Sequence, residues 1–142
     1  MTSRRAVALT LPLWVLVGLM WFVVTRNRHP TVGLAVITTS AIVVAYAVAA
    51  YLHHLILIPR FLRTGRRVAY AGLLAIVMVL LTGAALVVIR AAYERVVGPE
   101  PDPVRTWVTH FGIDLFGMAV HLLAAAVFVR IATRSPRFPA TS

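Results

Sequence analysis

The residues with the greatest chemical potential lie in one apolar stretch near the end of the sequence. His110, Asp114 and His121 recur at spacings of four and seven residues, which places them with Gly117 on one face of a helix. A carboxylate inside a bilayer is costly and marks a functional or paired position, and histidine titrates near neutral pH. Two hypotheses stay open: a pH- or ligand-responsive switch, and a structural hydrogen-bonded pair that fixes helix register.

A partner for Asp114 is expected on another helix, and Arg90 is the candidate. In antiparallel helices the two residues would lie within roughly 10 Å of each other in depth. The flexible arginine stem narrows such a gap, and His110 lies nearer still to Arg90 in depth. The sequence therefore predicts an intramembrane polar cluster of His110, Asp114, His121 and Arg90.

Haem or metal binding would use the same histidines, but their positions argue against it. Bis-histidine haem needs two imidazoles at one depth, whereas His121 lies well inside its stretch and His53 and His54 lie near the end of another. The chain has no cysteine, and no nucleophile–base pair, phosphate-binding glycine loop or paired-carboxylate site appears. We expect no enzyme activity, no catalytic residue, no cofactor and no metal.

The composition places the elements that carry these residues in a membrane. The 142-residue chain is 61% hydrophobic and 13% charged, with a mean hydropathy of +0.89, whereas about a quarter of a soluble domain is charged. The net charge of +10 comes from arginines that flank apolar runs. Membrane topology explains such charges better than nucleic-acid binding does.

Four apolar runs are long enough to cross a bilayer, at about residues 6–25, 31–58, 68–97 and 104–131. Their short links predict antiparallel neighbours. We expect an all-α fold, with residues 1–142 forming one membrane domain, a four-transmembrane-helix antiparallel bundle. No cleavage site follows the first run, which favours an uncleaved helix over a signal peptide. Residues 133–142 contain two prolines and are predicted to form a flexible cytoplasmic tail.

Arginine bias predicts the orientation of this bundle. Both termini and the central turn should be cytoplasmic, because cytoplasmic loops are enriched in basic residues. Nine of the fourteen basic residues would then lie inside, namely Arg4, Arg5, Arg60, Arg63, Arg66, Arg67, Arg130, Arg134 and Arg137. We expect a multi-pass protein of the inner, or cytoplasmic, membrane of a bacterial cell.

Small residues mark a helix-packing face on the second run. Ala41, Ala45 and Ala49 recur every four residues, and Thr38 and His53 extend the same stripe. Such residues let two membrane helices approach closely. If the chain is a signalling module, this face is expected to mediate self-association.

Proline and arginine are expected to end the second run in a basic turn from Pro59 to Arg67. Proline opposes continuation of a helix, and Gly65 lets the chain reverse. The turn carries four arginines, namely Arg60, Arg63, Arg66 and Arg67, which serve as topology anchors and can attract anionic lipids. The neighbouring His53 and His54 are interpreted either as a switch or as side chains that snorkel to the interface or bond backbone carbonyls.

One stretch resembles a known family. Its pattern is carried by Tyr51, His53, Leu57, Ile58, Pro59, Leu62 and Tyr70. It resembles a segment in the membrane region of LytS/YehU-type sensor histidine kinases, where a helix ends in Tyr-x-Asn-x-x-x-Leu-Ile-Pro before a basic turn. His53 stands where that family usually has asparagine. The given sequence also carries no residues of a kinase domain.

The resemblance implies a non-enzymatic, stand-alone sensor module, without kinase activity of its own. The expected partners are the lipid bilayer with its anionic lipids, a second copy of the chain, and a membrane or kinase protein. Two alternatives stay open: a structural or accessory subunit of a larger membrane complex, and a small oligomeric transporter. No nucleic-acid partner is expected. The sequence leaves open whether the chain is a complete gene product or a remnant of a longer kinase.

Overall fold

The computed structural model describes residues 3–134, with side chains for residues 12–102 and 104–127. Within these ranges the chain is helical and contains no strand. The elements are α1 (Ser3–Thr25), the 3-10 turn η1 (Arg26–Arg28), α2 (Val32–Leu52), the π-helix η2 (His53–Leu62), α3 (Arg67–Val96) and α4 (Pro103–Arg134). The prediction of an all-α fold is confirmed.

Among the residues described with their side chains, three helices are long and apolar enough to cross a membrane: Val32–Leu62, Arg67–Val96 and Val104–Val127. The first of these is the continuous helix made by α2 and η2. Large apolar side chains such as Val44, Leu80 and Phe116 face outward on them, which water would penalise and lipid would not. These helices indicate a membrane protein. α1 is not among the three, so a fourth crossing stays a prediction.

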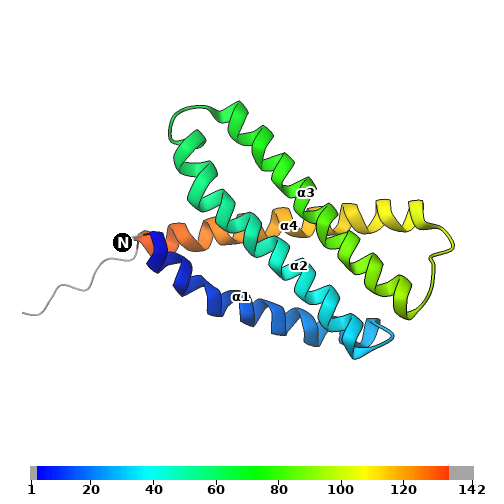
Figure 1. The fold of residues 1–142 in the computed structure, drawn as a ribbon. Coiled ribbons are helices and arrows are strands. Elements are labelled where there is room, and N and C mark those ends of the chain that lie inside the picture. Colours follow the sequence, from blue (N-terminus) through cyan, green and yellow to red (C-terminus); the bar gives the residue numbers. More distant parts are fainter. Residues whose placement is uncertain (1–2, 135–142) are drawn as a thin grey trace, which may run out of the picture.

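The helices form a bundle in which α2 is central. It packs against α1, α3 and α4, and α4 also packs against α3. In Figure 1, α2 and α3 run side by side and α4 crosses both at an angle. The start of α1, the end of α4 and the α2–α3 turn lie on one side of this view, and the other two links lie on the opposite side.

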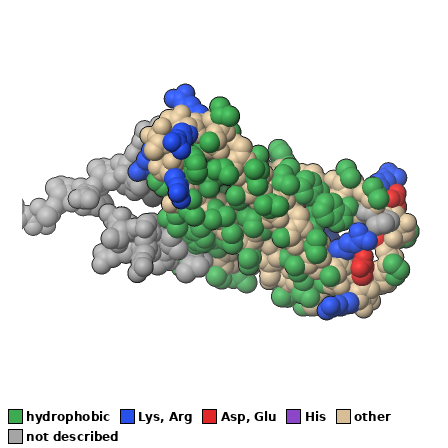
Figure 2. Space-filling model, turned by 45° about the horizontal axis from the view of Figure 1, so that its top comes forward, with side chains coloured by type: hydrophobic (Ala, Val, Ile, Leu, Met, Phe, Trp, Pro, Cys, Tyr) green, Lys and Arg blue, Asp and Glu red, His purple; other side chains and the backbone are tan. Residues whose placement is uncertain are grey.

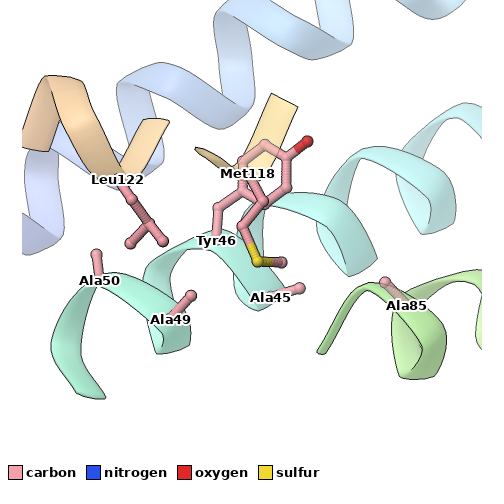
Figure 3. Packing of buried hydrophobic residues seen from close by; sticks show 7 residues of the cluster. All are labelled: Ala45, Tyr46, Ala49, Ala50, Ala85, Met118 and Leu122. Carbon is pink, nitrogen blue, oxygen red and sulfur yellow. The ribbon is translucent and has the colours of Figure 1, made fainter. Parts of the chain in front are cut away.

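The core is built from small residues of α2 and larger side chains of α4. Ala45 and Ala49 are buried beneath Met118 and Leu122, as Figure 3 shows. Thr82 of α3 is also buried and donates a hydrogen bond to the sulfur of Met118, with 3.9 Å between Oγ1 and Sδ. The alanine face is thus covered within the chain. The expectation that it mediates self-association is wrong, because no free surface remains at Ala45 and Ala49.

Local signals set the helix ends. The Thr31 side chain accepts a hydrogen bond from the Leu34 N–H at 3.2 Å and caps α2. Asp102 accepts a hydrogen bond from the Arg105 N–H at 3.2 Å, and Pro103 occupies the first position of α4, where its missing N–H costs least. Gly98 follows α3 with φ +106°, a left-handed conformation that glycine adopts without strain.

The predicted end of the second run before Pro59 is wrong. Helical structure continues through Pro59 to Leu62 as the π-helix η2, and the reversal begins only at Arg63. A proline ring normally clashes with the carbonyl four residues earlier. The wider π-helical turn, which bonds residues five apart, avoids that contact. The Arg63 N–H continues the pattern by donating to the Ile58 carbonyl at 3.0 Å, and Gly65 then reverses the chain with φ +79°.

The predicted tail begins inside α4. Helix α4 includes residues 133 and 134, because its last residue is Arg134. Residues 135–142, the remainder of the predicted tail, lie outside the described residues.

Enlarging a buried alanine should destabilise the bundle. We expect Ala49→Leu to lower the free energy of unfolding by about 1–3 kcal/mol, because the larger side chain must displace Met118 or Leu122. The matched control is Ala84→Leu, at an exposed position of α3. Denaturant titration in detergent micelles measures both. Equal stability of the two variants would contradict the packing described here.

Candidate functional site

A cavity of ≈ 500 Å³ opens between α2, α3 and α4 at the end that holds the α1–α2 and α3–α4 links. Pockets for small molecules measure roughly 300–1,000 Å³. Its apolar walls come from Ile42 of α2 and from Leu86 and Ile89 of α3. Aromatic walls come from Tyr93 and Trp107. The cavity therefore has the size and the mixed lining of a small-molecule site.

Charged side chains gather around this cavity. Arg28, Arg90, Glu94, Glu100 and Asp114 all line it. In Figure 2 the red acidic side chains of the visible face appear only at one end of the molecule, where blue arginines accompany them. A broad hydrophobic band separates this end from the arginines at the other end. The cavity is thus the place where both signs of charge meet.

The predicted pairing of Arg90 with Asp114 is wrong. The Arg90 guanidinium Nε lies 2.6 Å from Glu94 Oε1, one helical turn along α3, and both side chains are 42% exposed. An ion pair within one helix needs no bending toward a neighbour, and at this exposure it contributes little stability. The Asp114 carboxylate makes no hydrogen bond or ion pair with any described side chain.

The predicted polar cluster is divided between two places. Arg90, His110 and Asp114 line the cavity, whereas His121 does not. Asp114 lies eleven residues after the start of α4, which corresponds to roughly 16 Å along the helix axis. Thr38 also lines the cavity, and its hydroxyl oxygen is buried and has no hydrogen-bond partner.

His121 joins three helices in the second place. Its Nδ1–H donates to the Gly117 carbonyl at 2.8 Å, and its Nε2 accepts a hydrogen bond from the Trp21 indole at 3.4 Å. Its ring also packs on Tyr46, with 4.7 Å between ring centroids. This arrangement requires the neutral tautomer with the proton on Nδ1. His121 therefore links α1, α2 and α4.

Tyr46 connects this second place to the cavity. Its hydroxyl donates to the backbone carbonyl of Asp114 at 3.1 Å. The same hydroxyl lies so close to Gly117 that a Cβ there would collide with it. The glycine thus lets Tyr46 cross α4, and the crossing fixes the position of Asp114.

Two residues of the family-like motif meet at the far end of α2. His53 is buried, and its Nε2 lies 2.6 Å from the Tyr70 hydroxyl across the α2–α3 turn. The His54 ring packs edge-on against His53, with 4.8 Å between centroids, and its Nε2 is buried without a hydrogen-bond partner. Neither ring bonds a backbone carbonyl through its described contacts, because His53 bonds Tyr70 and His54 packs on His53. The carbonyl-bonding interpretation is therefore wrong, whereas the snorkelling and switch interpretations stay predictions.

The other motif residues support this turn without forming a ligand site. Leu57 is buried, Tyr51 and Ile58 are half-buried, and Pro59 and Leu62 are exposed. The four arginines of the turn, Arg60, Arg63, Arg66 and Arg67, are exposed as well. Among the residues that the structure describes, no group of three or more histidine, aspartate or glutamate side chains could hold a metal ion.

Several cavity residues were missed by sequence reasoning. Trp107, Tyr93 and Glu100 were assigned no role, although they line the same cavity as Asp114. One signal was available: three of the four acidic residues, Glu94, Glu100 and Asp102, lie in or beside one link, and the fourth, Asp114, lies in the helix that follows it. His29, which bonds the Tyr93 hydroxyl, offered no comparable signal because it lies 64 residues away.

Comparison with protein-family models, with curated proteins and with solved structures finds no match.

A methyl group at Gly117 should separate α2 from α4. We expect Gly117→Ala to displace Tyr46 and lower the thermal stability, because the added Cβ collides with the tyrosine hydroxyl. Gly112→Ala is the matched control: no atom lies near its added Cβ, and alanine favours a helix by about 1 kcal/mol. Thermal unfolding in detergent measures both.

The double variant Tyr46→Phe/Gly117→Ala identifies the cause. Removing the hydroxyl removes the collision. Tyr46→Phe should therefore lower the thermal stability less in the Gly117→Ala variant than in the parent protein. Equal costs in both backgrounds would exclude the hydroxyl as the source of the destabilisation.

Proposed function

We propose that this chain is a non-enzymatic, stand-alone signalling module of the bacterial inner membrane, with a sensor-like role. It crosses the bilayer four times with both termini in the cytoplasm. The observation that carries the proposal is the polar cavity between three helices. It lies at the opposite end of the bundle from the start of α1 and the end of α4. A membrane sensor requires a ligand-binding site at one end of the bundle and a contact with its partner at the other.

The contacts of α2 supply a physical route between the ends. Thr38 and Ile42 line the cavity, Tyr46 bonds the Asp114 carbonyl, and His53 bonds Tyr70 beside the basic turn. A ligand that moves Asp114 therefore acts on Tyr46, and through α2 on the α2–α3 turn. Such a ligand shifts the conformational equilibrium only by its difference in affinity for the two states.

The resemblance to LytS/YehU-type sensor regions supports the same function. In this chain its motif lies at the end of α2 and at the turn, where a cytoplasmic partner would make contact. The partner is a separate histidine kinase or response regulator. The exposed arginines of the turn hold anionic lipids at about 1 kcal/mol each. If a second copy of the chain associates, it does so through lipid-facing surfaces, because the alanine face is covered.

Cysteine labelling tests the four crossings and their direction. The chain has no cysteine, so Ser3→Cys, Asn27→Cys and Thr64→Cys each introduce a single thiol. In spheroplasts, a membrane-impermeant maleimide should label Asn27→Cys and should label Ser3→Cys and Thr64→Cys only after the membrane is opened. The cysteine-free parent is the blank. Labelling of Ser3→Cys and Asn27→Cys from the same side would exclude the crossing by α1.

Purification from native membranes in mild detergent, followed by mass spectrometry, tests the signalling role. We expect a histidine kinase or response regulator to remain bound, and Arg63→Gln with Arg66→Gln to weaken its retention. The corresponding change at the other end, Arg95→Gln, is the control. Stoichiometric recovery of a large respiratory, photosynthetic or transport assembly would replace the proposal with the structural-subunit function.

A further inference from the structure

The acidic residues of this protein are concentrated at one cavity. The chain carries four acidic residues against fourteen basic ones, and three of the four, Glu94, Glu100 and Asp114, line the cavity between α2, α3 and α4. The fourth, Asp102, bonds the Arg105 N–H at the start of α4. The lining contains two arginines, so with neutral histidines it carries a charge of −1 (two positive, three negative) in a chain of +10.

Two of these charges belong to the ion pair on α3 and cancel each other. Arg90 and Glu94 neutralise each other at 2.6 Å. Arg28 then faces two carboxylates, Glu100 near the mouth and Asp114 deeper in α4. No described side chain forms an ion pair with either carboxylate. Apart from the Arg90–Glu94 pair, the cavity thus holds one more carboxylate than arginine.

The inner end of the cavity combines hydrogen-bond acceptors with apolar walls. The Thr38 hydroxyl oxygen is buried and has no partner, and a buried polar atom without a partner is costly. It lines the same cavity as the Asp114 carboxylate. The apolar side chains of Ile42, Leu86 and Ile89 complete this region. A ligand with both N–H donors and an apolar part would satisfy these groups together.

Aromatic rings add a second attraction for positive charge. Trp107 and Tyr93 line the cavity, and the Trp107 ring is held by stacking on Phe111 with 5.6 Å between centroids and an angle of 11°. The face of an aromatic ring attracts cations, and tryptophan does so most strongly. A fixed indole in a cavity that also contains carboxylates suits the binding of an ammonium group.

We propose that this cavity binds a small organic cation, an ammonium group carried on an apolar body. Asp114 pairs with the charge, Glu100 near the link attracts it from a greater distance, Thr38 accepts one N–H, and Trp107 covers the apolar body. Phosphate or carboxylate ligands would face the two unpaired carboxylates and are disfavoured. This inference deepens the proposed function, since it assigns a ligand class to the same site.

The test compares three probes of similar size that differ in the charge of their head group. They are 2-phenylethylamine, 2-phenylethanol and 3-phenylpropionate, which share the phenylethyl group, and they are titrated by calorimetry into the protein in phosphatidylcholine nanodiscs, with empty nanodiscs as the blank. We expect the amine to bind at least about 10-fold more tightly than the alcohol, because a hydrogen-bonded charge pair replaces a neutral contact. No binding is expected for the carboxylate. Equal affinities, tighter binding of the carboxylate, or no binding of any probe would overturn the proposal.

Two charge-neutralising variants locate the bound amine. Asp114→Asn should weaken amine binding by about 10-fold and the more distant Glu100→Gln by about 3-fold, whereas Asp102→Asn should leave it unchanged. Asn remains a good helix cap at residue 102, so that control keeps its structural role. Glu100→Gln lies in an exposed link and tests the proposal even if Asp114→Asn fails to fold. Unchanged affinity in Glu100→Gln and in folded Asp114→Asn would overturn it.

A further arm separates a soluble amine from a lipid amine. Adding phosphatidylethanolamine to the nanodiscs should weaken binding of 2-phenylethylamine if the lipid's ammonium group occupies the site, and should not alter it if the ligand is soluble. Either result supports an ammonium ligand and identifies its source. Failure to purify a signalling partner would refute the proposed function alone and would leave amine binding intact.

Discussion

The close crossing of α2 and α4 is the constraint on which the rest of the structure depends. At Gly117 the tyrosine hydroxyl of α2 occupies the space that any larger residue would fill, and it bonds the backbone one turn earlier. Lipid supplies little hydrophobic force between helices, so close packing and interhelical hydrogen bonds must hold them together. The alanines beneath Met118 and Leu122 continue the same contact (Figure 3). This crossing brings a carboxylate of α4 beside the early turns of α2.

The distribution of charge follows from the same bundle. Arginines can lie at either end of a membrane helix, but the acids occupy only the links and helix ends on one side and a single position in α4. The α3 pair is formed within its own helix, which leaves the acid of α4 without an ion-pair partner among the described side chains. The cavity is thus electrically distinct from the rest of a strongly basic chain. Such a contrast favours recognition of charge over simple packing.

Sequence reasoning predicted the class of fold well, because apolar runs and their links are local features. It placed Arg90, His110 and Asp114 near one another in depth, and the three residues line one cavity. Its predictions failed where the contacts of a side chain depend on how its helix is rotated about the helix axis. His121 follows the same face as Asp114, yet it bonds Trp21 and not a cavity group. The Arg90–Glu94 pair was overlooked because a neighbour one turn away competes with any partner on another helix. The role of Gly117 depends on a tyrosine 71 residues away, which no local pattern reveals.

The π-helix before the basic turn has a consequence for the direction of that turn. Each residue of a helix rotates the chain by about 100°, and the wider η2 segment departs from that step over ten residues. The direction in which the arginines of the turn point therefore depends on the number of residues in η2 as well as on the identity of those residues. A change of one residue in its length would aim the same charges at different neighbours. The length of η2 therefore determines which neighbours the arginines of the turn face, and the composition of the chain alone does not reveal it.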